Sequence, residues 1–372
     1  MKKTVSLLLS LVMLFSVLAG CSGAAGTATP SPSSSQTAGT ATESTPPSES
    51  ATRSFTDSAG RTVEVPSQIT RVAVTGPMAQ IVVFALAPDK LVGISTEWDA
   101  SAQQFLDSKY YNLPLLGQVY GGKGEMNLEE LLASNAQVVI DVGEPKDTIV
   151  EDMDNLTEQT GIPFVHITAT LQTMGDAYRS LGDLLGMTEE ASALADYCDS
   201  TYTRIADLAD KVQKVNLLYI TGSEGLNVIA KSSYHAEIID LLSNNLAVVD
   251  TPSSKGTGNE VDMEQILNWN PDYIIFSPDS VYGSVQGDPT WEKLPAIQNG
   301  NYCEAPMGPY NWMGFPPSVQ RLLGMMWMAK VLYPDQANYD LYQEAQQYFK
   351  LFYHCDLTQA QYDALVANSL TT

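Results

Sequence analysis

Two carboxylate side chains occupy matching positions in a pattern that this chain carries twice. The pattern reads MNLEELLASNAQVVI at residues 126–140 and VDMEQILNWNPDYII at residues 261–275. The copies align Glu129 with Glu264, and they share three further identical pairs: Leu132/Leu267, Asn135/Asn270 and Ile140/Ile275. Each copy is typical of a helix followed by a strand, and each glutamate falls in the first helical turn. Two equivalent surface carboxylates are suited to bind a partner that presents two equivalent cations.

Much of the repeat is explained by helix stability. Asn127 and Asp262 stand where an N-cap belongs, and Glu130 and Gln265 follow three residues later, which predicts a capping box in each copy. The matched asparagines are expected to end the helices. The apolar positions expected to face the cores are Leu131, Leu132, Ile266 and Leu267. An acidic residue in the first turn is also favoured by the helix dipole, so this ordinary role for the matched glutamates stays open.

No residue pattern supports catalysis. The G-x-S-x-G and HExxH motifs are absent, and no cysteine has an obvious histidine partner. Residues 117–124 (GQVYGGKG) fit the first part of a phosphate-binding loop, but Gly124 stands where Ser or Thr must hold Mg²⁺. We therefore expect neither an enzyme nor a nucleotide site.

Histidine is too scarce for a site that holds a naked metal ion, which needs several converging ligands. The chain has only His166, His235 and His354. His166 lies in a strand pattern and is expected in the core, and His354 lies in the C-terminal tail, so His235 alone is placed to face a ligand. The net charge of −24 and the lack of a basic stripe exclude nucleic acid. A chelated or organic ligand fits better than a free ion, and no metal site is expected.

The first 52 residues are expected to export and tether the protein. Residues 1–20 have two lysines followed by an apolar run, which is typical of a signal peptide. The sequence Leu-Ala-Gly-Cys that ends at Cys21 resembles a bacterial lipobox and predicts lipidation of the Cys21 sulfur; an ordinary signal peptide or a short membrane helix is the alternative. Residues 21–52 are rich in Ser, Thr, Ala, Gly and Pro, which predicts a disordered tether.

The remaining residues, about 320, are expected to form two α/β lobes and a connector. Strands and helices alternate over residues 53–170 and again over residues 214–372, which end in a helical tail. Residues 171–213 carry no strand pattern; Gly186 separates two helices, and the second, capped by Thr188, runs for about 25 residues. Further predicted elements are strands at 71–76, 90–95, 164–168 and 246–250 and a helix at 317–334. The two copies of the repeat take equivalent places in the two lobes.

Several short motifs, in their order and spacing, make the folded chain similar to a known family. They are DSAGRTVEVPSQITRVAV, LPLLGQ, NLEELLA, VDMEQILNWNPDYIIF and DPTWEKLPAIQNGNYCEAP. Together they resemble the substrate-binding lipoproteins of ATP-driven importers for iron-siderophore complexes, haem and cobalamin. The resemblance implies two Rossmann-like lobes with mainly parallel sheets, joined by one long helix, with the ligand in the cleft between them. It also implies that Glu129 and Glu264 dock on arginines of the importer's permease.

The resemblance further implies where the ligand contacts lie. The Gly-rich loop before the first repeat borders the cleft of that family, which makes Tyr120 and Lys123 candidate contacts unless the loop is a simple turn. In the second lobe, Tyr310 and Trp312 stand among Gly and Pro residues where the family has aromatic contacts. Arg321 either reaches a ligand carboxylate or caps surface carbonyl groups. Further candidate contacts are Trp98, Tyr282 and His235.

The expected ligand is a small-molecule metal chelate, with a ferric siderophore as the first candidate. Haem, cobalamin and an oxyanion such as molybdate or tungstate are alternatives; for haem, the candidate axial ligands are Met78, Tyr120 and His235. The expected partners are the permease dimer and ATPase of an ABC importer. The protein is expected to be a monomer without a cofactor, held on the extracytoplasmic face of the cell membrane by its lipid anchor alone. A ligand-sensing lipoprotein that is coupled to no importer, or an enzyme that reuses the fold, is the alternative from another class.

Overall fold

A three-stranded parallel sheet lies at the centre of the first lobe. In the computed structural model, which describes residues 51–120 and 125–370, its strand order is β3 (Val72–Val74), β4 (Val138–Gly143) and β5 (Phe164–Thr168). Every side chain of β3 and β4 is buried, which is why these strands read as continuous apolar runs. An antiparallel hairpin of β1 (Thr52–Thr56) and β2 (Thr62–Pro66) precedes the sheet, and the sequence patterns do not predict it.

The two faces of this sheet belong to different cores. Val139 of β4 packs into a core of the first lobe, in which α3 (Leu128–Ala133) and α4 (Ile149–Thr160) also take part. Its neighbour Ile140 packs into a much larger core, to which α1 (Pro77–Leu86) contributes. Successive side chains of a strand point to opposite faces, so each strand serves both cores.

The second lobe repeats this arrangement around a larger sheet. Its strand order is β11-β10-β6-β7-β9, with β8 beside β6, and β6, β10 and β11 are parallel. Leu218 packs into a core of the second lobe, whereas its neighbour Leu217 packs into the larger core. The strands are β6 (Asn216–Thr221), β7 (Asn227–Val228), β8 (Asn244–Asn245), β9 (Asn259–Glu260), β10 (Tyr273–Phe276) and β11 (Tyr302–Glu304). The helices are α7 (Glu237–Leu242), α8 (Met263–Trp269) and α9 (Pro295–Gln298).

Short helices occur along the whole chain. The 3₁₀ helices are η1 (Pro88–Lys90), η2 (Ala100–Gln104), η3 (Tyr234–Ala236), η4 (Tyr282–Ser284) and η5 (Trp291–Lys293), and α2 (Ser108–Tyr111) is a further short helix.

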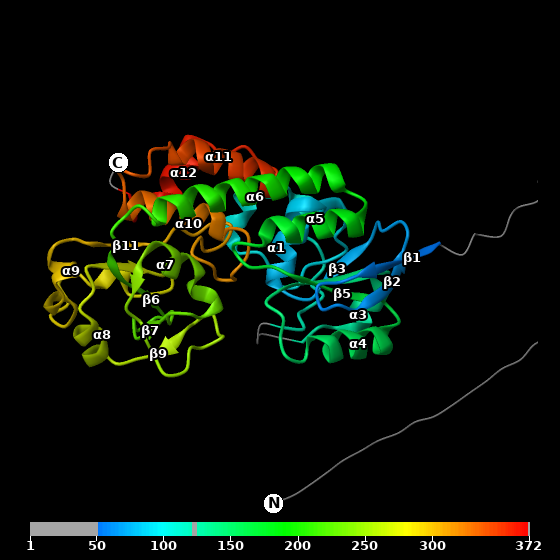
Figure 1. Cartoon of the computed structure of the whole chain (residues 1–372), viewed down its shortest axis with the longest axis horizontal. Helices are drawn as coiled ribbons and strands as arrows, with labels where there is room; N and C mark the ends of the chain where they lie inside the picture. Colours follow the sequence, from blue (N-terminus) through cyan, green and yellow to red (C-terminus); the bar gives the residue numbers. More distant parts are fainter. Residues whose placement is uncertain (1–50, 121–124, 371–372) are drawn as a thin grey trace, which may run out of the picture. The chain divides into compact units, whose positions relative to one another are not determined.

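Two antiparallel helices connect the lobes, α5 (Met174–Leu185) and α6 (Thr188–Ala209) (Figure 1). Gly186 ends α5 in the left-handed conformation, with a φ of 66°, as predicted. The predicted cap at Thr188 is wrong, because the Met187 amide bonds back to the Gly182 carbonyl and α6 begins at Thr188 itself. With 22 residues, α6 is roughly 33 Å long.

The last three helices, α10 (Arg321–Leu332), α11 (Leu341–Phe352) and α12 (Gln359–Val366), complete the larger core (Figure 1). Residues 321–329 of α10 are all buried, so this helix is covered on every side. The Phe349 ring of α11 lies 5.0 Å from the Phe105 ring of the first lobe. The predicted helical tail therefore packs against the first lobe as well as the second. One cluster of buried residues runs from β1 to α12; we call it the shared core.

Two predicted strands are wrong. Residues 90–95 form only isolated bridges, because Leu91 pairs with Val72 whereas Ile94 pairs with Leu115, and two different partners leave no continuous ladder. Residues 246–250 lie outside β8, because the Asn245 side chain accepts a hydrogen bond from the Ala247 amide at 3.1 Å and turns the chain. The helix predicted at 317–334 begins only at Arg321.

The predicted N-caps of the repeat are confirmed. The Asn127 side chain accepts hydrogen bonds from the amides of Glu129 and Glu130, and Asp262 accepts one from Gln265. The complete capping box predicted for the first copy is wrong, because the Asn127 amide donates to the Leu116 carbonyl at 2.8 Å instead of to Glu130.

Both repeat helices end in the predicted way. Asn135 and Asn270 adopt positive φ values of 53° and 45°, a conformation that asparagine tolerates better than most residues. Leu131 and Ile266 are fully buried, as expected. The prediction for Leu132 is wrong: it is 49% exposed, because the short helix α3 turns only the Leu131 side toward the sheet.

Several predictions concern residues outside the described part of the chain. These are the signal peptide at 1–20, the lipidated Cys21, nearly all of the tether at 21–52, and Lys123. Within the described residues, no helix has both the length and the apolar character needed to cross a membrane. Cys198, Cys303 and Cys355 are free thiols.

Gly324 lets the loop at 306–320 approach α10 closely. A Cβ atom at this position would overlap the Trp312 carbonyl oxygen, whereas a Cβ at Gly283 would meet nothing within 4 Å. We expect Gly324→Ala to lower the free energy of unfolding by roughly 1–3 kcal/mol, because backbone must move to make room. Gly283→Ala should change it by less than about 0.5 kcal/mol. Denaturant unfolding of both variants measures the difference, and equal stabilities would contradict this account.

Candidate ligand-binding site

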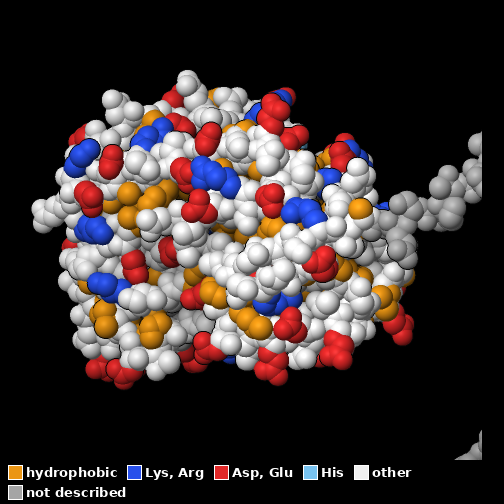
Figure 2. All heavy atoms as spheres, turned by 45° about the vertical axis from the view of Figure 1, so that its right-hand side comes forward, with side chains coloured by type: hydrophobic (Ala, Val, Ile, Leu, Met, Phe, Trp, Pro, Cys, Tyr) orange, Lys and Arg blue, Asp and Glu red, His pale blue; other side chains and the backbone are white. Residues whose placement is uncertain are grey.

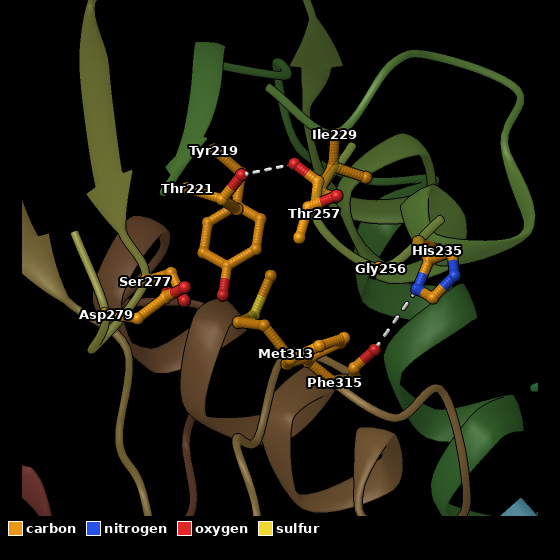
Figure 3. A pocket seen from close by; sticks show the side chains of 11 residues that line it. Tyr219, Thr221, Ile229, His235, Gly256, Thr257, Ser277, Asp279, Met313 and Phe315 are labelled. Carbon is orange, nitrogen blue, oxygen red and sulfur yellow. Dashed lines mark hydrogen bonds between the residues drawn. The ribbon is translucent and has the colours of Figure 1, made fainter. Parts of the chain in front are cut away.

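A small pocket lies at the carboxyl end of the second sheet (Figure 3). Tyr219 and Thr221 come from the end of β6, and Ser277 and Asp279 follow β10 directly. The other lining residues are Ile229, His235, Gly256, Thr257, Met313, Gly314 and Phe315. Ligand sites of α/β proteins commonly lie at this edge of the sheet. The enclosed space is about 10 Å³, room for a single water molecule.

Asn311 orients two hydroxyl groups of this pocket. Its side-chain oxygen accepts a hydrogen bond from the Met313 amide at 2.8 Å, which fixes the amide group so that its NH₂ faces the other way. That NH₂ donates to the Tyr219 hydroxyl at 3.0 Å and to the Ser277 hydroxyl at 3.2 Å. A further contact of 3.5 Å between the Tyr219 hydroxyl and the Asn311 oxygen is too long to be a strong bond. Both hydroxyl oxygens therefore act as acceptors toward Asn311.

The electrostatics of the pocket are those of neutral donors beside one carboxylate. Burial raises the pKa of Tyr219 to about 12, so its hydroxyl keeps its proton at neutral pH. The Thr221 hydroxyl is already used, since it donates to the Thr257 carbonyl at 2.8 Å. None of the described lining residues is lysine or arginine, and Asp279 forms no ion pair within the described chain.

His235 forms one wall of the pocket (Figure 3). Its Nδ1 lies 3.4 Å from the Gly314 carbonyl oxygen, and its Nε2 lies 3.3 Å from the Ser254 carbonyl oxygen. Burial lowers the pKa of His235, which favours the neutral ring. Because both nitrogens face backbone carbonyl groups, the ring must turn before it can bind a ligand or haem iron, and that role stays a prediction.

A chain of buried polar groups lies at the equivalent edge of the first sheet. The Thr75 hydroxyl donates to Asp141, and the other Asp141 oxygen lies 2.7 Å from His166 Nδ1. His166 Nε2 in turn lies 3.1 Å from the Thr168 hydroxyl. His166 is completely buried, which confirms its predicted place in the core. These groups satisfy one another, as buried polar groups must.

Tyr120 lies beside this group and is partly buried. Its hydroxyl donates to the Asp152 carboxylate at 2.7 Å, and Lys146 Nζ lies 3.0 Å from the centre of its ring. Desolvation raises the pKa of Tyr120 and lowers that of Lys146. The Tyr120 hydroxyl is engaged within the protein, so any ligand would meet its ring. The partner predicted beside it, Lys123, lies outside the described residues.

Three predicted aromatic contacts are buried in the shared core instead of lining the pocket. The Trp98 ring lies 5.7 Å from the Tyr310 ring, and the Tyr310 hydroxyl accepts a hydrogen bond from Gln80 at 3.1 Å. Trp312 is only 1% exposed and donates to the Gly308 carbonyl at 3.1 Å. In this arrangement the three side chains pack the lobes together. Their contact with a ligand stays a prediction, one that the packing does not support.

Arg321 is also completely buried. Its guanidinium pairs with the Glu237 carboxylate at 2.5 Å and donates to the Tyr234 carbonyl at 3.0 Å. Glu237 in turn accepts hydrogen bonds from the Leu171 amide at 3.2 Å, which links the second lobe to the connector. The expectation that Arg321 caps surface carbonyl groups is wrong because of this burial, and the only carboxylate it reaches within the described chain is Glu237.

Tyr282 lies outside the set of residues that line the pocket. Its ring lies 5.9 Å from the Tyr302 ring and 6.3 Å from the Phe276 ring, on the local core of the second lobe. The segment SPDSVYG supplies Ser277 and Asp279 to the pocket instead. Sequence reasoning missed these two residues although they directly follow β10, at the edge of the sheet where ligand sites commonly lie.

Tyr219 and Asn311 were also missed. In the sequence, Tyr219 is one more apolar position of a buried strand. Asn311 stands between Tyr310 and Trp312, whose aromatic side chains are the more obvious candidates for ligand contact. No local signal identifies Asn311, because its role depends on β6 and β10, far away in the sequence.

The matched glutamates of the repeat are exposed. Glu129 and Glu264 are the second residues of α3 and α8, and neither forms an ion pair within the described chain. Over residues 51–120 and 125–370, no group of three or more His, Cys, Asp or Glu side chains is placed to hold a metal ion.

Comparisons with known proteins agree with this arrangement. A molybdate-binding protein, MolA of Haemophilus influenzae, is 24% identical over 333 residues, which cover 82% of this chain and 91% of that protein. An ABC transporter solute binding protein from Sulfurospirillum deleyianum has a similar structure, with a TM-score of 0.77, 25% identity and coverage of 85% of this chain and 99% of that one. The catecholate-siderophore binding protein VctP of Vibrio cholerae shares the fold, with a TM-score of 0.55, 16% identity and coverage of 74% and 99%.

The predicted fold class, an α/β protein of two lobes with mainly parallel sheets, is confirmed by these structures and by the sheets described above. The family model described as "Periplasmic binding protein" matches residues 72–307, which is more than half of the chain. The chain therefore belongs to the periplasmic binding protein family and is a solute-binding protein of the kind that serves ABC importers.

Proposed function

We propose that this protein is a lipid-anchored receptor that captures a metal-containing solute outside the cytoplasm and passes it to the permease of an ABC importer. The observation that carries the capture step is the second-lobe pocket, where Asn311 orients the Tyr219 and Ser277 hydroxyl groups at the end of the sheet. The lobes, the connector and the exposed repeat glutamates are all parts that such a receptor needs. No catalytic pattern competes with this function.

The proposed cargo is a metal chelate, with a ferric siderophore first and haem or cobalamin next. A chelate suits the described residues because its metal is already coordinated, so the protein has to bind only its outer atoms. The enclosed space of about 10 Å³ is far too small for a chelate, so its capture requires the site to open. Molybdate is a second candidate, favoured by the similarity to MolA and by the small size of the pocket.

Docking through Glu129 and Glu264 is part of the same proposal. Capping of the repeat helices is done by Asn127 and Asp262, so the glutamates are not needed for it. One exposed carboxylate on each lobe can pair with one cation on each half of a permease dimer. Because both glutamates must pair with the permease at the same time, such docking also depends on the relative position of the two lobes.

The cargo is identified by calorimetric titration of the mature protein with ferric siderophores, haem, cobalamin and molybdate. We expect one of them to bind with one-to-one stoichiometry, because the second-lobe pocket supplies one set of binding groups. The apo protein titrated with ferric chloride alone is the control, and it should show no specific site. A protein that binds none of these solutes would contradict the proposed cargo.

Replacing both docking residues, Glu129→Gln with Glu264→Gln, should lower importer-dependent uptake at least tenfold because two ion pairs are lost. Solute affinity should stay within about twofold, since neither residue lines the pocket. The matched control is Glu130→Gln with Glu260→Gln, which removes two other exposed carboxylates. Equal uptake by the test and control variants would rule out the docking role.

Cys21→Ser should release the protein from the membrane, because the lipidated sulfur is the only proposed anchor. Phase partitioning of cell extracts with detergent measures the change: the wild-type protein is expected in the detergent phase and the variant in the aqueous phase. Ser22→Ala is the control and should behave as the wild type. A variant that stays in the detergent phase would show that the anchor lies elsewhere.

A further inference from the structure

We infer that the second-lobe pocket is a subsite for a carboxamide group of the solute, with Tyr219 and Ser277 as donors and Asp279 as acceptor. This inference rests on the proposed function and deepens it, because it names the chemical group that the pocket recognises. The argument has three steps, which concern the free protons, the free carboxylate and the lack of positive charge.

The first step is the count of protons at the two hydroxyl groups. Both oxygens accept from the single NH₂ group of Asn311, whose orientation is fixed by the Met313 amide. Two hydroxyl groups have two protons, and at most one of these can be shared between the hydroxyls themselves. The remaining proton meets the Asn311 side-chain oxygen only at 3.5 Å, which is too long for a strong bond, so a better placed acceptor atom of the solute can take it. Tyr219 is 5% exposed and Ser277 is 4% exposed, so a donor left unpaired here is costly.

The second step is the carboxylate on the same side of the pocket. Figure 3 shows Asp279 beside Ser277, near the end of the Tyr219 side chain that carries the hydroxyl. Asp279 is exposed and has no ion-pair partner in the described chain, so its oxygens are available to a donor. The pocket thus offers a donor and an acceptor side by side. A carboxamide offers the complementary pair, a carbonyl oxygen next to an N–H.

The third step excludes a strongly anionic group. None of the described lining residues is lysine or arginine, and Asp279 is an acidic side chain. An oxyanion bound here would be repelled by Asp279, and the nearest cation, Arg321 behind Gly314, is already paired with Glu237. A neutral carbonyl oxygen accepts the same hydrogen bonds without that cost.

Asn311 has a positioning role in this subsite. It is 3% exposed, and its side-chain amide bonds to the two hydroxyls and to the Met313 amide, whereas its backbone carbonyl accepts a hydrogen bond from the Gln320 side chain at 3.4 Å. Its replacement by aspartate removes the NH₂ donor but keeps the shape. The hydroxyl protons would then turn toward the new carboxylate and be lost to the solute.

The test is calorimetric titration of the mature protein with two chelates that carry amide groups, cyanocobalamin and ferrioxamine B, and with ferric citrate and molybdate, which carry none. We expect an amide-bearing chelate to bind most tightly. Tyr219→Phe, Ser277→Ala and Asp279→Ala should each weaken its binding about tenfold. Tyr302→Phe, which removes a hydroxyl outside the pocket, is the matched control and should change affinity by less than about twofold. Unfolding temperatures of all variants show whether each is folded.

Two results would overturn the subsite. One is tighter binding of ferric citrate or molybdate than of either amide-bearing chelate. The other is an amide-bearing chelate whose affinity is unchanged in Tyr219→Phe and Asp279→Ala. Asn311→Asp, which keeps the shape of the side chain, should also weaken binding of that chelate, and an unchanged affinity would count against the subsite in the same way. Either result leaves solute capture intact and so separates the subsite from the proposed function. A wild-type protein that binds none of the four probes would overturn the proposed cargo and the subsite together.

Discussion

The shared core is the constraint on which the rest of the structure depends. Each sheet contributes one of its faces to this core and keeps the other for a core of its own lobe. A face of a parallel sheet cannot be left in water, because its strands are apolar on both sides. The lobes therefore cannot be separated without exposing α1, α6, α10 and α11 together. This makes the two lobes and the C-terminal tail one unit in energetic terms, although the sequence reads as two repeats.

The position of the pocket follows from that core. The loop at 306–320 lies on α10, which is covered on all sides, and Gly324 permits the close approach of the loop backbone. That contact places Asn311 against the ends of β6 and β10, where Tyr219 and Ser277 stand. The ion pair between the buried Arg321 and the partly exposed Glu237 lies behind the loop and reaches the connector. Loss of Glu237 would leave the buried guanidinium without its counter-ion, so we regard this pair as a contact that helps to fix the geometry.

The chemistry of the pocket agrees with the acidic character of the chain. The net charge is −24, and the described lining residues include no lysine or arginine. Neutral hydroxyl donors, oriented by an amide, are a way to bind oxygen atoms in such surroundings.

The sequence by itself determined the elements whose signals are local. These are the buried strands of both sheets, the helix end at Gly186, the N-caps Asn127 and Asp262 and the left-handed asparagines that close the repeat helices. Each depends on residues within a few positions, so short-range spacing is enough to predict it. The two-lobed α/β fold followed from their order and from the family resemblance.

Only the tertiary structure decided which residues meet. It buried Trp98, Tyr310, Trp312 and Arg321, which had seemed to be ligand contacts, because large side chains near a ligand site serve equally well to pack two lobes together. It assembled the pocket from Tyr219, Ser277, Asp279 and Asn311, which come from three separate segments. Short-range spacing cannot reveal such a site, because its hydrogen bonds join residues up to 92 positions apart and form only after the shared core has brought the strands and the loop together.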